Sequence, residues 1–360
     1  MRFSDIVRKA WSDNRLFSVL LELTYRCNLD CFFCYNDLSL RGRPLTKGQY
    51  FELLDDLRRL EVLNLILSGG EPLAHPDFLD IGARARSLGF VVRIKSNGHA
   101  LRGEMARRIR DEIDPFVVEV SLHGATAETH DRQTRVAGSF GQLVENLSAA
   151  RRLGLRLKIN STLTRWNEHE VGGMLDLADE IGVPLQFDPE VTARDDGDSS
   201  PLAISPSPEG IERLLRLLRS RAAESRGDSV SPAMVGRQDE ELAPTVARDK
   251  HCGAGSSTVA VDPFGTVYPC VQWRRSVGSL HDQTIEEIWN GSAVLGEVRQ
   301  QGVAIKQMVD GFGAGGRHLG FCPGSAEAVA GSPFAVAASQ LQRMETSQRV
   351  GREELLPVLR

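Results

Sequence analysis

The chain lacks any hydrophobic run long enough to span a bilayer, because no apolar stretch approaches the roughly eighteen residues of a membrane helix. Its N-terminus carries scattered charges in place of the apolar core of a signal peptide. A dominant charge is also missing, since 43 basic and 48 acidic residues leave a net charge of −5. We therefore expect a cytoplasmic protein, with neither nucleic acid nor a membrane as its partner.

The chain has few cysteines, but they are not scattered. The 360 residues are 41% hydrophobic and 25% charged, as is typical of globular proteins, and leave room for two ordinary domains or for one large domain with an appendage. Clustered cysteines in a cytoplasmic chain of this size more often hold a metal or do chemistry than form disulfides. The six are Cys27, Cys31, Cys34, Cys252, Cys270 and Cys322.

Strand-like and helix-like segments alternate through the first two thirds of the chain. Six short apolar segments predict strands, at residues 17–24, 62–67, 91–95, 116–122, 155–162 and 185–187. Each of these strands is followed by a segment with the pattern of a helix. The first helix begins at a Thr46–Gln49 capping box, and the others are predicted at residues 76–88, 101–113, 140–153, 168–181 and 208–225. This rhythm predicts right-handed βαβ units and a parallel sheet. Six units are too few for an eightfold barrel, so we expect a partial (β/α)6 TIM barrel with its site at the C-terminal strand ends.

The pattern changes after about residue 190. Residues 192–207 are rich in Asp, Ser and Pro and predict a loop. Residues 258–268 predict a β-hairpin with Gly265 in its turn, followed by helices at 284–289 and 292–300. We expect a lead-in helix (1–15), the barrel (16–225), a linker (226–250), a small hairpin-plus-helix module (251–325) and a C-terminal tail with a helix (326–360).

The first cysteine triplet follows strand one directly. Cys27, Cys31 and Cys34 have the spacing C-x3-C-x2-C, and thiolates this crowded suit a soft metal or an iron–sulfur cluster. Three ligands on a four-iron cube leave one iron open. A zinc ion would need a fourth ligand, and no His or further Cys lies nearby in the sequence. Free thiols and a zinc site completed by a distant residue remain alternatives.

Polar and glycine-rich turns close the next strands. Gly69 and Gly70 allow close backbone approach to a charged ligand, and Glu71 adds an acidic group. Asn97 and Ser121 can hydrogen-bond to hydroxyl groups. The segments are Ser68-Gly-Gly-Glu71-Pro72, Lys95-Ser-Asn-Gly98, Ser121-Leu-His-Gly124 and, on the fifth strand, Asn160.

Together with the cysteine loop, this series resembles the radical S-adenosylmethionine (radical SAM) superfamily over residues 16–190. The resemblance implies that the first triplet holds a [4Fe–4S] cluster and that the strand-end turns bind S-adenosylmethionine. Thr134 stands where relatives often carry an arginine on the cofactor carboxylate. The implied cofactor-binding residues are Gly69, Gly70, Glu71, Ser96, Asn97, Ser121 and Asn160.

The second triplet resembles the auxiliary-cluster extensions of that superfamily, the SPASM and twitch domains. The resemblance rests on Cys252-x12-Gly265-x4-Cys270 with the intervening hairpin. A full SPASM domain has seven cysteines and two clusters, whereas only Cys252, Cys270 and Cys322 remain here, so one auxiliary [4Fe–4S] cluster is expected. The fourth ligand of this cluster would be solvent, the substrate or a non-cysteine side chain. The alternative to a cluster is a disulfide between Cys252 and Cys270. The candidate side chains are His251, Asp262 and His318.

The resemblance implies cleavage of S-adenosylmethionine to a 5′-deoxyadenosyl radical that abstracts hydrogen; no general base is identifiable. Relatives with such extensions mostly modify ribosomally made peptides, and residues 187–197 look like a segment of those maturases. The expected partners are a precursor peptide, a separate leader-peptide recognition protein because only about fifteen residues precede strand one, and an electron donor such as ferredoxin or flavodoxin. The alternatives are a radical SAM enzyme of small-molecule cofactor, haem or sugar biosynthesis, and a non-catalytic iron–sulfur or zinc module.

Overall fold

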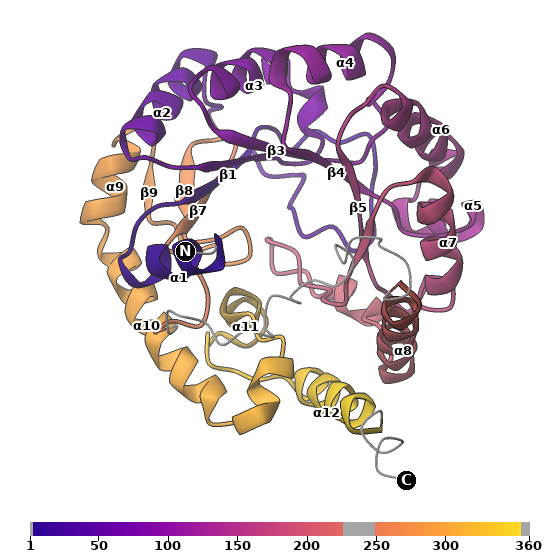
Figure 1. Ribbon diagram of the computed structural model, residues 1–360. Helices are drawn as coiled ribbons and strands as arrows, with labels where there is room; N and C mark the ends of the chain where they lie inside the picture. The colour runs from indigo at the N-terminus through magenta and orange to yellow at the C-terminus, as the bar shows by residue number, and fades with distance from the viewer. Residues whose placement is uncertain (1–2, 226–248, 354–360) are drawn as a thin grey trace.

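The centre of the molecule is one curved sheet, seen from its strand ends in Figure 1. The computed structural model describes residues 3–225 and 249–353. Six parallel strands lie in chain order, and the order β6-β5-β4-β3-β2-β1 leaves β6 at one edge of the sheet. The predicted partial barrel is thereby confirmed. Its strands are β1 (Ser18–Glu22), β2 (Asn64–Ser68), β3 (Val91–Ser96), β4 (Val117–Ser121), β5 (Leu157–Thr162) and β6 (Leu185–Asp188).

Helices cover the outer face of this sheet, and the main apolar core lies between the two layers. The predicted capping box opens the first of them: Gln49 N donates to Thr46 Oγ1 (3.3 Å), and Thr46 N donates to Gln49 Oε1 (3.1 Å). Buried leucines at helical spacing, such as Leu53, Leu54 and Leu57, turn inward from it. These helices are α2 (Lys47–Arg59), α3 (Phe78–Ser87), α4 (Gly103–Arg108), α6 (Ser139–Arg152), α7 (Val171–Ile181) and α8 (Pro208–Ser225).

One helix, α5 (Ala127–Thr134), was not predicted, because its sequence has almost no apolar residue. Its N-cap is Thr126, whose hydroxyl accepts from Thr129 N (3.3 Å), and a carboxylate from outside the helix supports this cap. Glu170 accepts hydrogen bonds from Ala125 N (2.6 Å) and from the Thr126 and Thr129 hydroxyls (2.7 Å each). Side-chain capping thus supplies the stability that an apolar face provides in other helices.

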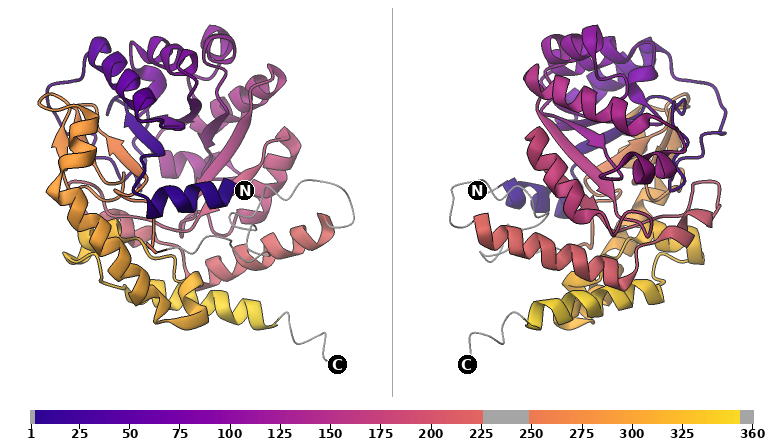
Figure 2. Two further views of the ribbon diagram at one scale, coloured as in Figure 1. Left: turned by 60° about the vertical axis from the view of Figure 1, so that its left-hand side comes forward. Right: turned by 90° about the vertical axis from the view of Figure 1, so that its right-hand side faces the viewer.

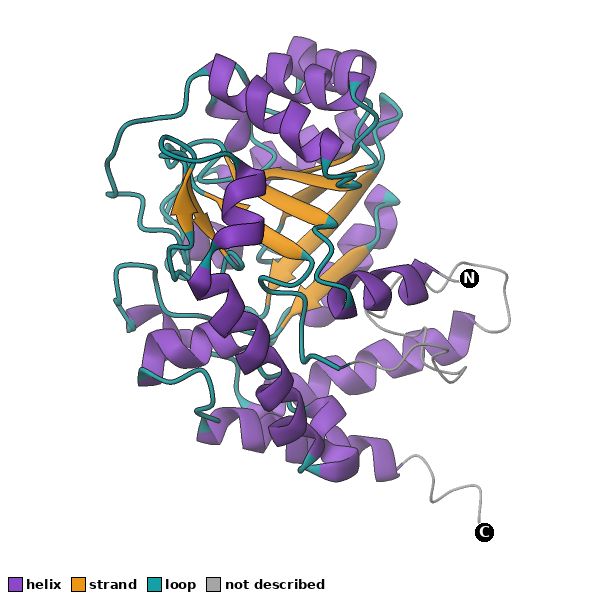
Figure 3. Ribbon diagram, turned by 90° about the vertical axis from the view of Figure 1, so that its left-hand side faces the viewer, coloured by secondary structure: helices purple, strands orange, loops and turns teal. Residues whose placement is uncertain are grey.

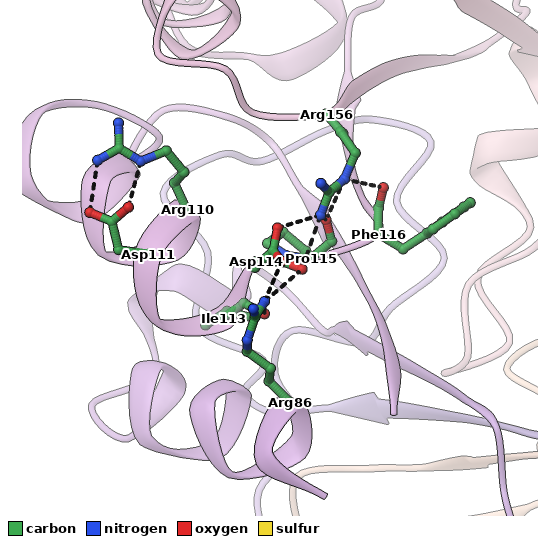
Figure 4. A network of polar contacts seen from close by, with 8 residues as sticks. All are labelled: Arg86, Arg110, Asp111, Ile113, Asp114, Pro115, Phe116 and Arg156. Carbon is green, nitrogen blue, oxygen red and sulfur yellow. Dashed lines mark hydrogen bonds and ion pairs between the residues drawn. The ribbon is translucent and has the colours of Figure 1, made fainter. Parts of the chain in front are cut away.

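The segment expected as one helix at 101–113 is divided. α4 passes into a π-helical turn, η2 (Ile109–Ile113), and ends at Asp114 in the left-handed conformation (φ 43°). Figure 4 shows two arginines holding this end: Arg156 donates to the Pro115 and Phe116 carbonyls and pairs with Asp114 (2.5 Å), and Arg86 pairs with the same carboxylate (2.5 Å). The network sets where β4 begins.

The C-terminal hairpin does not form a sheet of its own. β7 (Thr258–Val261) pairs in parallel with β1, and β8 (Thr266–Tyr268) and β9 (Gly278–Ser279) follow antiparallel, giving one nine-stranded sheet (Figure 3). The separate module expected from the sequence is therefore continuous with the barrel. The physical reason is that β1 would otherwise be an edge strand with unpaired backbone groups.

Of the remaining helices, α9, α10 and α12 continue the ring, whereas α1 and α11 lie inside it in Figure 1. α12 packs against α8 (Figures 1 and 2). A second, smaller apolar cluster lies in this part, around Trp273, Ile305 and Phe321. The expected loop 192–207 contains a short 3-10 turn, η3 (Ser200–Ile204), and a second such turn, η4 (Gly313–His318), precedes Cys322. Most of the predicted linker lies outside the described residues. The helices are α1 (Phe3–Ser12), α9 (Ile285–Gly291), α10 (Ala293–Asp310), α11 (Pro323–Ala330) and α12 (Ala338–Glu353).

No helix within residues 3–225 and 249–353 combines the length and the apolar character that crossing a bilayer requires.

Candidate active site

The first cysteine triplet lies on the loop that leaves β1. Cys27, Cys31 and Cys34 are free and partly buried, and all three border one cavity of about 710 Å³. Backbone hydrogen bonds from Asp30 N to Thr134 O (3.1 Å) and from Phe32 N to Gln133 O (3.0 Å) fasten the loop to the end of α5. The unpredicted helix is therefore the support of the cysteine loop.

The same cavity brings together residues from the C-terminal ends of five other segments. Asn97 links it to the cysteine loop, because its Nδ2 donates to Asn28 Oδ1 (2.8 Å) and approaches Cys27 Sγ (3.7 Å). Asn160 is held from below by Glu119 Oε2 (2.6 Å). Nine of the residues that the sequence predicted therefore surround one space: Cys27, Cys31, Cys34, Gly69, Gly70, Ser96, Asn97, Ser121 and Asn160.

The two glycines have a steric role that the sequence only suggested. A Cβ atom on Gly70 would lie 2.6 Å from Arg26 O, and one on Gly69 would collide with Thr24 O. Gly69 also has φ +133°, which other residues rarely adopt. Gly70 N donates to Thr24 O (2.7 Å). The end of β2 thus lies directly against the start of the cysteine loop, which only glycine permits.

Glu71 differs from the other predicted residues, because it does not line the cavity. Its carboxylate is 2% exposed and accepts hydrogen bonds from Ser96 Oγ (2.9 Å), Asn97 N (2.8 Å) and Leu73 N (3.1 Å). Burial raises its pKa despite these bonds. Glu71 thus fixes the turn carrying Ser96 and Asn97, and its role in binding the cofactor stays a prediction.

The thiols of this loop fit an iron–sulfur cluster better than a single metal ion. Within the described residues, no three His, Cys, Asp or Glu side chains converge as a mononuclear site requires. A four-iron cube holds its cysteines on separate irons, whereas zinc draws them to one point. Burial raises the pKa of Cys34 to about 11 and that of Cys31 further, so these thiols ionise when a metal centre stabilises the thiolates.

The second triplet comes from three separate segments. Cys252 and Cys270 pack against the smaller apolar cluster, while Cys322, before α11, borders the cavity of the first triplet beside Gln272 and Ser325. The thiols interact electrostatically: after burial, the charges of Cys270 and Cys322 are among the causes that raise the pKa of Cys252 to about 12. The three thiols are thus close enough to influence one another's ionisation, and an auxiliary cluster held by all three stays a prediction.

All three candidate fourth ligands have other contacts. Asp262 holds the hairpin turn, accepting from Phe264 N (2.9 Å) and Thr266 N (2.8 Å), and Gly265 takes the left-handed conformation there (φ +82°). A ring nitrogen of His251 lies 2.8 Å from Phe321 O, next to Cys322 in the chain. His251 thus contacts the residue before Cys322, whereas Asp262 serves the hairpin. A ring nitrogen of the third candidate, His318, lies 3.1 Å from Ser347 Oγ.

A partly buried arginine that no sequence pattern indicated, Arg274, joins the two cysteine regions. Arg274, four residues after Cys270, donates to both oxygens of Glu22 (2.9 Å each) at the end of β1. It also pairs with Asp195 (2.9 Å) and donates to Asn36 (3.3 Å), two residues after Cys34. Glu22 is fully buried. The sequence offered one signal for this ion pair: Glu22 ends an apolar strand, and a buried carboxylate needs a cationic or hydrogen-bonding partner.

Comparison with known proteins agrees with this geometry. Residues 21–178 match the model of the radical SAM superfamily, and residues 252–307 match that of SPASM, an iron–sulfur cluster-binding domain. The native anSMEcpe structure with bound AdoMet superposes with a TM-score of 0.72 at 16% identity, over 95% of this chain and 98% of that one.

Three relatives span most of the chain. Pre-heme d1 synthase of Dinoroseobacter shibae is 30% identical over 80% of this chain and 77% of its own length. Mycofactocin maturase MftC of Mycobacterium ulcerans is 30% identical over 78% and 76%. PqqA peptide cyclase of Methylorubrum extorquens is 27% identical over 78% and 73%. The chain belongs to the radical SAM superfamily, as an enzyme that uses S-adenosylmethionine and a [4Fe–4S] cluster and carries an auxiliary iron–sulfur cluster-binding domain.

Proposed function

We propose that this enzyme modifies a ribosomally made peptide by abstracting a hydrogen atom from it, through a crosslink, an epimerisation or a related C–H functionalisation. When bound and reduced, the first cluster supplies the electron that cleaves S-adenosylmethionine into methionine and a 5′-deoxyadenosyl radical. The observation that carries the proposal is the shared cavity, which is bordered by the first triplet, the strand-end turns and Cys322 of the second triplet.

In this proposal, each group of residues has a distinct task. Cys27, Cys31 and Cys34 hold the radical SAM cluster, and Cys252, Cys270 and Cys322 hold one auxiliary [4Fe–4S] cluster. Gly69, Gly70, Ser96, Asn97, Ser121 and Asn160 bind and orient S-adenosylmethionine, while Glu71 keeps Ser96 and Asn97 in place. Orientation matters because the reacting carbon must be held near the radical and away from water.

Two observations favour a peptide as the substrate. PqqA peptide cyclase, which by its name acts on a peptide, is among the relatives that span most of this chain. In addition, β6 is an edge strand, and its continuation through Asp188, Glu190, Val191 and Thr192 borders the cavity. Edge strands and extended segments offer backbone groups to which a peptide can pair.

The second candidate is a small-molecule radical SAM enzyme, which the 30% identity to pre-heme d1 synthase favours. Co-expression with the short reading frames next to the gene, followed by mass spectrometry, separates the two. A mass change in one peptide that disappears with Cys31→Ala supports the peptide proposal. Unchanged peptides, with intact 5′-deoxyadenosine formation by the purified enzyme, would contradict it and favour the small molecule. Adding or omitting a leader-binding protein, and flavodoxin or ferredoxin as the electron donor, then tests these proposed partners.

A further inference from the structure

A layer of charged side chains lies inside the barrel, beneath the proposed cofactor-binding residues. Lys95 of β3, Glu119 of β4 and Lys158 of β5 are direct neighbours in the sheet, by the pairings Lys95–Glu119 and Glu119–Lys158. All three line the cavity. Ser121 and Asn160 lie two residues further along β4 and β5, about 7 Å higher along the strands. The three strands run side by side in Figure 1.

Positive charge is in excess in this layer. Arg93, one strand repeat below Lys95, pairs with Glu119, and Lys95 Nζ lies 3.6 Å from the same carboxylate. Glu119 is 4% exposed and is thus enclosed by cations, which outweigh the effect of burial and lower its pKa. Lys158 donates to the neutral amide oxygen of Gln186. Three cations therefore share one carboxylate at this depth.

The other acids of the cavity wall do not balance this excess. Asp188 is paired with Thr162 in the sheet, two residues above Asn160 and four above Lys158. Glu190 lies further still along the chain and forms an ion pair with Arg343 of α12 (2.6 Å). Among the described residues, Lys158 contacts only a neutral amide and forms no ion pair, and burial lowers its pKa, so a charged ammonium group is costly at this position. A ligand anion would remove that cost.

We propose that Lys95 and Lys158, supported by Arg93, form a carboxylate-binding subsite on the floor of the cavity. The bound carboxylate belongs either to the substrate or to the methionyl end of the cofactor, since both carry this group. Glu119 is the positioning residue: it holds Lys95 and Arg93 from one side and Asn160 from the other. The subsite does not depend on whether the substrate is a peptide or a small molecule.

Saturation-transfer NMR on the anaerobically reconstituted holoenzyme tests the subsite, with glutarate as the probe and glutaramide as its uncharged analogue. Glutarate should bind, and glutaramide should bind at least tenfold more weakly, because a charge-assisted hydrogen bond contributes about 1.5–3 kcal/mol. Equal binding of the two probes, or no glutarate binding, would overturn the proposal.

Variants locate the binding. Lys95→Met/Lys158→Met should weaken glutarate binding at least tenfold, whereas the matched control Lys306→Met should not change it, because Lys306 pairs with Asp310 within α10, away from the cavity. Iron content checks that the double variant folds. If the double variant does not fold, Lys158→Gln alone should also weaken glutarate binding. A folded variant that binds glutarate with wild-type affinity refutes the subsite.

Saturating S-adenosylmethionine identifies the source of the carboxylate. Displacement of glutarate by the cofactor, together with weaker cofactor binding in the Lys158→Gln variant, assigns the subsite to the cofactor. Glutarate binding that persists beside the cofactor assigns it to the substrate.

Discussion

Both cysteine triplets are proposed to hold an iron–sulfur cluster, but the chain brings their thiols together in different ways. The first lies within eight residues of one loop, which rests against the end of β2 through Gly69 and Gly70 and is fastened to α5. The second is collected from segments at positions 252, 270 and 322 and depends on an apolar cluster of its own. Only Cys322 of this triplet borders the cavity. The local triplet is thus directed at the reactants, and the dispersed one connects the C-terminal segments.

This difference predicts that the first triplet controls chemistry and the second controls the integrity of the C-terminal part. The following changes test the comparison in order of decreasing effect.

Removing one cysteine of the first triplet and all three cysteines of the second should give opposite results for cofactor cleavage. Cys31→Ala should abolish 5′-deoxyadenosine formation with dithionite and S-adenosylmethionine, because a cluster that lacks a ligand cannot present its open iron. Cys252→Ala/Cys270→Ala/Cys322→Ala should retain cofactor cleavage and lower the iron content from about eight to about four per chain. A wild-type content near four irons would show that no auxiliary cluster forms. Cofactor cleavage by the Cys31→Ala variant would show that the first triplet does not control the chemistry.

Breaking the link between the two regions comes next. Arg274→Met leaves the buried Glu22 carboxylate without its cation, which should lower the free energy of unfolding by about 3–5 kcal/mol in urea titrations. The Glu22→Gln/Arg274→Met variant removes both charges and should recover a large part of that loss. If Arg274→Met unfolds like the wild type, the two regions are not coupled through this pair.

Glycines give a matched test of close packing in each region. An alanine at Gly70 meets Arg26 O, and an alanine at Gly324 meets Gln272 O. Each substitution should cost about 1–3 kcal/mol, but Gly70→Ala should mainly lower occupancy of the first cluster and Gly324→Ala that of the second. Cluster-specific electron paramagnetic resonance measures both. Gly141→Ala is the control, because a Cβ atom there meets nothing within 4 Å. If Gly70→Ala and Gly324→Ala lose the signals of the two clusters equally, close packing does not act on each cluster separately.

The smallest effect concerns pH and only the first region. His123, whose ring lies 4.6 Å from that of Phe33, and His130 are buried, which lowers their pKa values to about 3 and about 4. Below pH 6.5 the unfolded chain binds protons that the folded protein does not, so stability should fall as the pH drops from about 6.5 towards 4.

His130→Asn removes one titrating ring while its side-chain oxygen can still accept from His123 N, as His130 Nδ1 does (3.1 Å). Between pH 6.5 and 5.5, the wild type should therefore lose about 1 kcal/mol more stability than this variant. The exposed His169→Asn serves as the control. Equal losses in all three proteins would show that the buried rings do not govern acid sensitivity.

The sequence predicted what depends on local pattern and could not predict what depends on distant partners. Alternating apolar segments placed the six parallel strands, and Thr46 with Gln49 marked the start of α2 correctly. The polar helix α5 was missed because it has almost no apolar residue and because the residue that supports its Thr126 cap, Glu170, lies more than forty positions away. The contacts of the Glu71 carboxylate with Ser96 and Asn97 were also not predicted, because a motif shows residue type but not the direction of a side chain. The Arg274–Glu22 pair joins residues 252 positions apart, a separation that no periodicity detects.

The pairing of β7 with β1 also sets an order of events during synthesis. The open edge of β1 leaves the ribosome early, but its partner, residues 258–261, follows about 240 positions later. Until then, the first cysteine loop follows a strand that has one unpaired edge. The free backbone groups of such an edge can pair with other chains. Delivery of iron and sulfide is thus best timed after the hairpin has emerged, and a chain cut short before residue 258 should aggregate rather than accumulate as a half-barrel.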